Sequence, residues 1–153
     1  AAAELAGRGI PVVLVEKSDR LGGQLNRWNQ VFPTEQAADE LVEKLQTELR
    51  SNSLVEILVN CQVTAVSGFV GSFKVTIEGP LGPGGSTISA KATIGAIVMA
   101  AGFRPYVPRE GEFLYKKDPG VVTMPEFIEL MRQNSGQSDR LVHQGREIRS
   151  VAF

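Results

Sequence analysis

The stretch VVLVEKSDRLGG, residues 12–23, decides the fold class. Its first four residues form an unbroken run of β-branched residues and leucine, which is typical of a parallel strand covered on both faces. Glu16 ends this run, and the glycine doublet Gly22-Gly23 follows a few residues later. In a doubly wound α/β sheet, an acidic residue at the carboxyl end of such a strand can accept hydrogen bonds from ribose hydroxyls. The stretch therefore predicts a nucleotide-binding α/β fold.

Helix and strand patterns on both sides extend this stretch. The preceding residues, AAAELAGRGI, are typical of the end of a helix that stops at Gly7 and Gly9. A helix is expected from its N-cap, Thr34, to about Asn52, because apolar residues recur there at helical spacing: Ala37, Ala38, Leu41, Val42, Leu45 and Leu49. A short strand, VEILVN, follows at residues 55–60.

The second half of the chain begins with short alternating segments. CQVTAVSG, GSFKVTIEG and STISAKAT predict a three-stranded antiparallel meander at about residues 61–93, with GPLGPGGS as its second joint. A further buried strand is expected in IGAIVMAAGFRP, residues 94–105, and a helix, MPEFIELMRQN, begins near Thr123 or Pro125. Residues 138–153 alternate enough for a hairpin whose last strand is cut off. This order indicates a three-layer α/β domain.

Composition excludes several classes of function. The chain has 153 residues, 42% hydrophobic and 22% charged, so it has the size of one domain and can bury a sizeable core. A net charge of -1 and the lack of a dense Lys/Arg cluster argue against nucleic acid or an anionic membrane as partner. No apolar run is long enough to span a bilayer, and no signal peptide is recognisable. We expect a cytoplasmic protein.

Metal and thiol chemistry are not expected. One cysteine, Cys61, permits no internal disulfide and no self-contained cysteine-ligated iron–sulfur cluster, and one histidine, His143, makes a transition-metal site improbable. Cys61 is interpreted as a small buried hydrophobe because no partner cysteine or flanking cation activates it. His143 is expected at the surface, and Trp28 and Phe32 in the core. No residue is assigned a catalytic role.

The order of these elements resembles the FAD-binding domain of the pyridine nucleotide-disulfide oxidoreductase superfamily. LVEKSDRLGG resembles its second strand and its Arg-x-Gly-Gly element, here Arg20–Gly23, and VTAV resembles its adenine-side segment. IGAIVMAAGFRP resembles the segment that closes the FAD site. GSFKVTIE and GVVTMPEFIELM are most similar to the A subunit of heterodisulfide reductase and its bacterial relatives. The cysteines by which the reductase subunit holds clusters are absent after VFPT, so the chain resembles a simpler relative.

The resemblance implies a fold class: α/β, a Rossmann-like FAD-binding domain whose parallel sheet carries an inserted antiparallel three-stranded meander and lacks its first strand. Residues 1–105 would be a partial FAD-binding domain, and residues 106–153 either a connecting segment with the start of the next domain or a returning part of the FAD domain. The phosphate-binding G-x-G-x-x-G and a starting Met are missing, so we interpret the chain as a fragment. The alternative is a sheet that is rearranged or completed by another chain, and FAD binding should suffer in either case.

The first group of candidate cofactor residues follows the opening strand. Glu16 would accept hydrogen bonds from the adenosine ribose, which favours FAD or NAD over NADP. Gly22 and Gly23 would let the backbone pass close to the pyrophosphate, although a tight turn alone also explains a doublet. Lys17 would cover the adenine face and Arg20 would neutralise phosphate; solvent-exposed positions explain both equally well.

The second group is assigned by the resemblance. Val63 would pair with the adenine edge through its backbone groups. Ala100, Ala101 and Gly102 would let the backbone approach FAD closely at the end of a buried strand, and tight packing of a helix on the sheet is the alternative.

These assignments predict part of an FAD-dependent oxidoreductase that holds the adenosine and pyrophosphate of FAD, in an electron-transfer flavoprotein of the same type as the heterodisulfide reductase A subunit. The isolated fragment should be inactive. Expected partners are FAD and other redox subunits that carry iron–sulfur clusters, and a homo-oligomer is left open. The alternative is a non-catalytic interaction or scaffold domain that kept the fold without FAD. A domain that binds only NAD does not explain the doublet.

Overall fold

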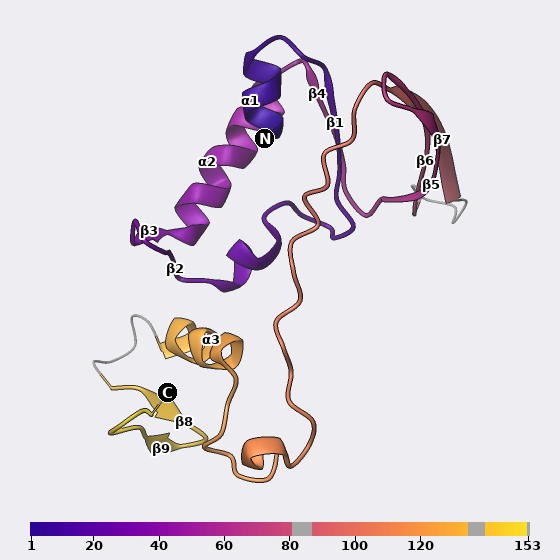
Figure 1. Cartoon of the computed structure of the whole chain (residues 1–153). Coiled ribbons are helices and arrows are strands. Elements are labelled where there is room, and N and C mark those ends of the chain that lie inside the picture. Colours follow the sequence, from indigo (N-terminus) through magenta and orange to yellow (C-terminus); the bar gives the residue numbers. More distant parts are fainter. Residues whose placement is uncertain (81–86, 135–139, 153) are drawn as a thin grey trace. The chain divides into compact units, whose positions relative to one another are not determined.

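The computed structural model describes residues 1–80, 87–134 and 140–152. Its residues form two compact units (Figure 1). The first unit comprises Ala1–Gly23 and Glu40–Ala101, and the second comprises Gln24–Asp39 and Gly102–Phe153. Each unit therefore draws on two separate parts of the sequence.

A small parallel sheet organises the start of the first unit. Helix α1 (Ala2–Gly7) is followed by β1 (Val12–Val15), which pairs in parallel with β4 (Val55–Leu58). α1 contacts both strands. Gly9 has φ +79°, a left-handed conformation that suits glycine at the end of a helix. The predicted helix end and both predicted strands are thus confirmed.

Helix α2 (Ala38–Ser51) does not begin directly after Thr34, as predicted, but three residues later. Its expected N-cap, Thr34, lies instead in the connection between the short antiparallel strands β2 (Gln30–Val31) and β3 (Gln36–Ala37). The Thr34 hydroxyl donates to the Val31 carbonyl at 3.3 Å, so it caps no helical N–H group. The predicted apolar face is present, and its buried members are Ala38, Val42 and Leu49.

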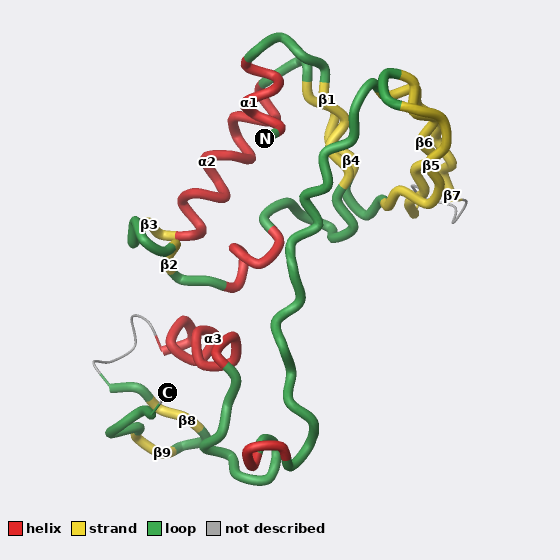
Figure 2. Tube along the Cα trace, in the orientation of Figure 1, coloured by secondary structure: helices red, strands yellow, loops and turns green. Residues whose placement is uncertain are grey.

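The predicted antiparallel meander is confirmed and forms the rest of the first unit (Figure 2). β5 (Gln62–Phe69), β6 (Ser72–Pro80) and β7 (Thr87–Ile94) lie side by side in that order. Val75 and Ile77 of the central strand are buried. Most of the predicted second joint, residues 81–86, lies outside the described residues. The α/β class, with one parallel pair and an antiparallel meander, is therefore correct.

The run predicted to be a buried strand at residues 94–105 is not one. β7 ends at Ile94, and residues 96–105 have no regular structure. The side chains of Val98 and Met99 are 62% and 83% exposed. A strand needs a neighbour to pair its backbone groups, and within the described residues this run pairs with neither β1 nor β4. The sequence pattern was that of a strand, but no adjacent strand supports it.

The second unit is built from short elements. It contains most of the 3₁₀ turn η1 (Gly23–Arg27), the turn η2 (Glu112–Leu114), helix α3 (Met124–Asn134) and the hairpin of β8 (Val142–His143) and β9 (Arg146–Glu147). Gln144 and Gly145 have φ +50° and +76°, as a two-residue hairpin turn requires. The predictions of a helix beginning near Thr123 and of a terminal hairpin are confirmed.

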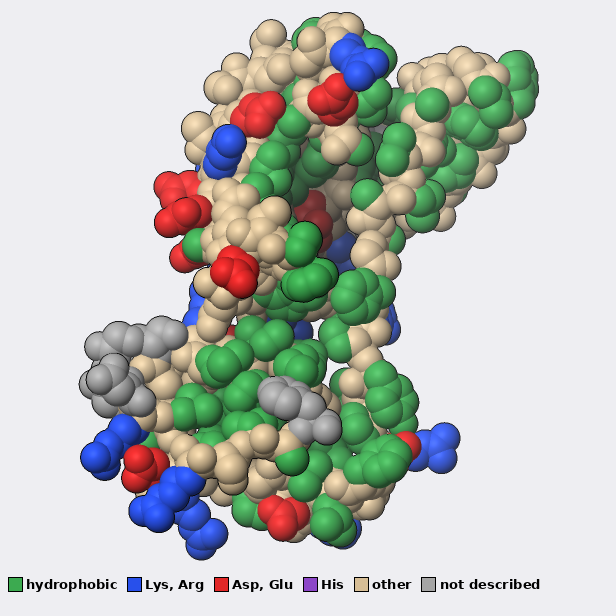
Figure 3. All heavy atoms as spheres, turned by 60° about the vertical axis from the view of Figure 1, so that its left-hand side comes forward, with side chains coloured by type: hydrophobic (Ala, Val, Ile, Leu, Met, Phe, Trp, Pro, Cys, Tyr) green, Lys and Arg blue, Asp and Glu red, His purple; other side chains and the backbone are tan. Residues whose placement is uncertain are grey.

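The hydrophobic core of the described residues is small. Its buried side chains are those of Ala6, Leu21, Ala38, Val42, Leu49, Val75, Ile77 and Tyr115. Phe32, expected in the core, is 93% exposed, and Trp28 is half-buried. Hydrophobic side chains also lie at the surface of each unit (Figure 3). The sizeable core that the composition allows is therefore not formed by these residues.

Candidate functional site

The carboxyl end of β1 holds Glu16 in a defined place. The Glu16 N–H donates to the Leu58 carbonyl at 2.9 Å, and the Glu16 carbonyl accepts from the Cys61 N–H at 3.0 Å. The carboxylate Oε1 accepts from the Ser18 N–H at 2.7 Å. Among the described residues, none donates to Oε2. A half-buried carboxylate is thus oriented at the strand end with one oxygen available.

The chain after β4 lies against the same strand end. The Asn60 N–H donates to the Ser18 carbonyl at 2.8 Å, which continues the contact between the two strands beyond Glu16. Two residues after Cys61, Val63 lies in β5, pairs with Ile77 and is 45% exposed. The predicted adenine segment therefore begins two residues after Cys61, whose N–H donates to the Glu16 carbonyl. Lys17 and Arg20 are exposed.

The glycine doublet follows a buried residue, Leu21, whose carbonyl accepts from Gln46 Nε2 at 3.3 Å. Gly22 and Gly23 have φ +117° and +51°, values that favour glycine. A Cβ atom on Gly23 would meet no other atom within 4 Å. The backbone conformation alone therefore explains a glycine at position 23, and the space beside it is open.

Ala100, Ala101 and Gly102 are exposed in irregular structure. Gly102 has φ +67°, and a Cβ atom there would also meet nothing within 4 Å. Within the second unit, Gln24 Nε2 donates to the Phe103 carbonyl at 3.3 Å. The residue after the doublet is therefore tied to the residue after Gly102, although 79 positions separate them in the sequence.

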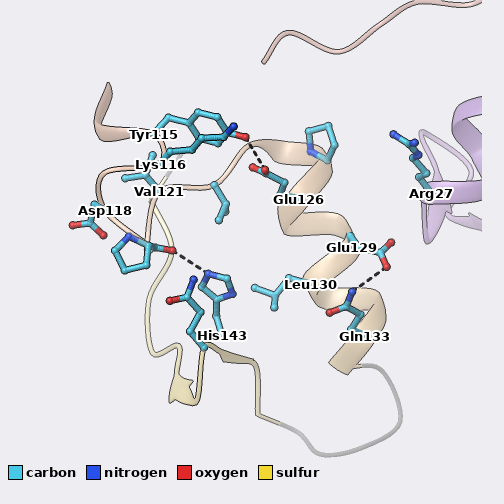
Figure 4. A pocket seen from close by; sticks show the side chains of 14 residues that line it. Arg27, Tyr115, Lys116, Asp118, Val121, Glu126, Glu129, Leu130, Gln133 and His143 are labelled. Carbon is cyan, nitrogen blue, oxygen red and sulfur yellow. Dashed lines mark hydrogen bonds between the residues drawn. The ribbon is translucent and has the colours of Figure 1, made fainter. Parts of the chain in front are cut away.

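A hollow that the sequence did not predict lies in the second unit (Figure 4). It has a volume of about 570 Å³ and is lined by α3, the preceding turn, the β8–β9 hairpin and Arg27. His143 Nε2 lies 3.0 Å from the Pro119 carbonyl. None of the predicted cofactor residues lines this hollow. It is a separate feature of the surface.

One side of the hollow is fixed by a capping box on α3. The Glu126 carboxylate accepts from the Thr123 N–H at 2.7 Å and from the Tyr115 hydroxyl at 2.7 Å. Burial opposes ionisation of Glu126, but the hydrogen bonds from Thr123 and Tyr115, with the nearby Lys116 charge, lower its pKa. The bond to Glu126 raises the pKa of the Tyr115 hydroxyl. The spacing Thr-x-x-Glu was a signal of this box in the sequence.

A similar set of hydrogen bonds to a carboxylate forms at the first residue of η2, Glu112. Glu112 accepts from the Arg109 N–H at 2.9 Å and from the Tyr106 hydroxyl at 2.7 Å, and these bonds lower the pKa of Glu112.

In the described parts of the chain, no group of three His, Cys, Asp or Glu residues could hold a metal ion. No helix among those described is long and apolar enough to cross a membrane.

Comparison with known proteins gives one consistent group of relatives. No protein-family model matches the chain. Over 78 residues, 51% of this chain and 12% of each relative, it is 35% identical to the first iron–sulfur A subunit of the CoB–CoM heterodisulfide reductase of Methanopyrus kandleri and to the corresponding A subunit of Methanocaldococcus jannaschii. The A subunit of the Methanosarcina acetivorans enzyme is also 35% identical over 78 residues. The chain thus spans only a small part of these relatives.

A solved structure, L-proline dehydrogenase from P. horikoshii, overlaps with 50% of this chain and 15% of its own at a TM-score of 0.44 and 23% identity. This overlap is too small to bear on the fold. The curated relatives, in contrast, are the same subunit of the same kind of enzyme. Over half of its length, the chain is therefore similar to the A subunits of heterodisulfide reductases, as its motifs indicated.

Proposed function

We propose that this chain belongs to an FAD-dependent oxidoreductase of the same type as the heterodisulfide reductase A subunit and holds the adenosine and pyrophosphate part of FAD. The observation that carries the proposal is the Glu16 carboxylate, oriented at the end of a parallel strand with Oε2 available. Two ribose hydroxyls are donors, and a carboxylate is the acceptor that matches them. The sequence similarity to heterodisulfide reductase A subunits supports the oxidoreductase part of the proposal.

The donor set fits the adenosine end of FAD. One Glu16 oxygen already accepts from the Ser18 N–H, so Oε2 would accept from one hydroxyl and the remaining lone pair of Oε1 from the other. Open space beside Gly23 leaves its backbone accessible to phosphate. In this role Arg20 and Lys17 would supply positive charge at the surface, and Val63 the adenine contact. FAD would supply the redox chemistry.

The open edge of β1 and the exposed run at residues 96–101 belong to the same proposal. We infer that both pair with one further strand from outside these 153 residues, which would extend the parallel sheet of β1 and β4. Two observations support it: within the described residues β1 pairs only with β4, and the run is apolar yet exposed. Such a strand would bury Val98 and place Ala100–Gly102 at the carboxyl edge of the sheet.

The proposed partners in electron transfer are other subunits that carry iron–sulfur clusters. The proposed location is the cytoplasm. A scaffold domain without FAD is the second candidate. The exposed apolar side chains of Val98 and Met99 favour it, because an interaction domain presents such side chains to a partner chain. An absorbance spectrum of the full-length protein separates the two, since only a flavoprotein has the flavin bands.

The test is titration of the full-length apoprotein with FAD. We expect Glu16→Ala to weaken binding by about 1.5–3 kcal/mol, the scale of a hydrogen bond to a charged group, and Glu16→Gln to weaken it less. Glu56→Gln is the matched control, because Glu56 is exposed on β4. FAD affinity that is unchanged in both Glu16 variants would remove Glu16 from the site.

A further inference from the structure

The turn η1, which follows the glycine doublet, is held by side chains from distant parts of the sequence. Gln24 Nε2 donates to the Phe103 carbonyl at 3.3 Å. Arg132 Nη1 donates to the Asn26 carbonyl at 2.6 Å, across 106 positions of sequence. All four residues lie in the second unit. The unit is thus tied together at this turn by two long-range contacts.

The turn needs such contacts because its own backbone fixes it weakly. A 3₁₀ turn of five residues has poorer hydrogen-bond geometry than an α-helix and is rarely stable alone. The Trp28 N–H donates to the Leu25 carbonyl at 3.2 Å, which is the long end of the usual range. The position of Gly23–Arg27 therefore depends on the side chains that reach it.

Arg132 is well placed to act as the stronger of the two contacts. It lies in the last turn of α3, whose first turn is fixed by the capping box of Thr123 and Glu126. A guanidinium that donates to a carbonyl makes a charge-assisted bond, stronger than a bond from a neutral amide such as Gln24. α3 therefore offers a fixed support, and Arg132 transmits its position to Asn26.

We propose that Arg132 and Gln24 are positioning residues for the cofactor site. They hold the turn that begins at Gly23 and join it to the backbone just after Gly102, so that two of the predicted cofactor segments keep fixed places. Neither residue needs to touch FAD. The proposal rests on the proposed function above.

Three variants of the full-length protein test the hydrogen bonds of Arg132 and Gln24, and one of them keeps the positive charge at position 132. Arg132→Ala removes the bond to Asn26, and Arg132→Lys keeps a charged donor. Gln24→Glu keeps the size of the side chain but removes the donor that faces Phe103. Matched controls are Arg149→Ala and Gln36→Glu, which make the same kinds of change at exposed residues.

FAD affinity and the visible circular dichroism of bound flavin are measured together, and thermal unfolding of each apoprotein reports the fold. We expect Arg132→Ala to weaken FAD binding about 3–10-fold and Gln24→Glu about 2–5-fold, with recovery in Arg132→Lys and no change in the controls. The flavin dichroism should change in the two weakened variants and return to that of the unmodified protein in Arg132→Lys. A purely structural role would move the unfolding temperature and leave the bound flavin spectrum unaltered.

The outcomes distinguish a failure of the proposed function from a failure of the positioning role. If the unmodified protein binds no FAD, the proposed function fails and this inference fails with it. If the unmodified protein binds FAD and both Arg132→Ala and Gln24→Glu bind it equally well with the same spectrum, the positioning role is wrong and the proposed function stands. If Arg132→Ala does not fold, Gln24→Glu and Arg132→Lys decide the question in the same titration.

Discussion

The meander and the segment that follows it differ in structure although both contain apolar runs. Residues 62–80 and 87–94 form three antiparallel strands, with one register shift between Val63 and Ala65, whereas residues 96–105 form none. The strands of the meander are neighbours in sequence, so each finds its partner across a turn. A parallel strand needs a partner brought from far along the chain. A strand-like sequence thus becomes a strand only where a partner is within reach.

The two regions are also held by different forces. β6 is paired on both edges, and Val75 and Ile77 are buried on it. The later segment, which we take to run on from residue 96 to α3, is instead fixed by side-chain hydrogen bonds, from Tyr106 to Glu112 and from Tyr115 to Glu126. A ladder with an apolar face resists local opening better than isolated bonds at the surface. The two regions should therefore respond to different perturbations.

The two regions should differ most clearly in the cost of replacing one valine in each with alanine. Val75 is 5% exposed and Val98 is 62% exposed. Val75→Ala should lower the free energy of opening of the meander by about 2 kcal/mol, because it removes buried apolar surface. Val98→Ala should change it by less than about 0.5 kcal/mol. The measurement is hydrogen exchange of the β6 amides in each variant.

An equal effect of the two substitutions would contradict the comparison, because it would show Val98 to be buried in solution. The same measurement on a longer chain that supplies the proposed additional strand sharpens the result. There, Val98→Ala should become as costly as Val75→Ala, since both side chains would then be buried.

Local patterns explain how much of the fold could be predicted. Periodicity and turn residues were enough for α1, the meander, α3 and the hairpin, because each is set by neighbours in sequence. The apolar runs of β1 and β4 also predicted strands, although these two strands pair from distant parts of the sequence. The start of α2 was missed because the Thr34 hydroxyl bonds to Val31 and does not cap the helix. The strand predicted at residues 94–105 was wrong. The pattern of this run is that of a buried strand, but burial depends on a partner strand from elsewhere in the sequence.

The candidate site could be predicted less completely. The position of Glu16 at a strand end follows from its local sequence and is seen in the structure. The bond from Ser18 to its carboxylate depends on a side-chain conformation that no pattern specifies. The contacts of Gln24 with Phe103 and of Arg132 with Asn26 join residues far apart, so only the folded chain reveals them.

A substitution at Gly79 tests the packing of the meander edge with a smaller expected effect. A Cβ atom on Gly79 would collide with Cys61 Sγ and lie 2.9 Å from the Asn60 carbonyl oxygen. Gly79→Ala should therefore destabilise the meander by about 1–2 kcal/mol, as overpacking does. Cys61→Ala should recover part of this loss in the double variant, because it removes the sulfur. Urea unfolding of the four chains forms a double-mutant cycle.

Strictly additive effects in this cycle would show that the two side chains do not meet. Cys61→Ala alone should cost little stability and leave the proposed electron transfer by the full-length protein intact, since the thiol is interpreted as a packing group. Loss of turnover with FAD still bound would instead give the thiol a chemical role.

The smallest expected effect is the response of the later segment to acid. Burial opposes ionisation of Glu126, but the hydrogen bonds from Thr123 and Tyr115 lower its pKa in the folded chain. A carboxyl group with a depressed folded pKa contributes stability above its unfolded pKa, and this contribution is lost as the pH falls through the folded pKa. It is therefore complete at neutral pH and declines below about pH 4.

Hydrogen exchange of the Thr123 amide reports this bond directly, because that N–H donates to Glu126 at 2.7 Å. After correction for the intrinsic rate, its protection should fall as the pH drops from neutral to below the ordinary pKa of a glutamate, while the β6 amides keep theirs. Glu126→Gln should lower the protection of Thr123 already at neutral pH and abolish the acid response. Glu78→Gln, which removes a carboxyl group from the meander, is the matched control and should leave both unchanged. If the meander and Thr123 lost protection together in the unmodified chain, the two regions would open as one unit, and the contrast between a ladder and isolated side-chain bonds would not hold.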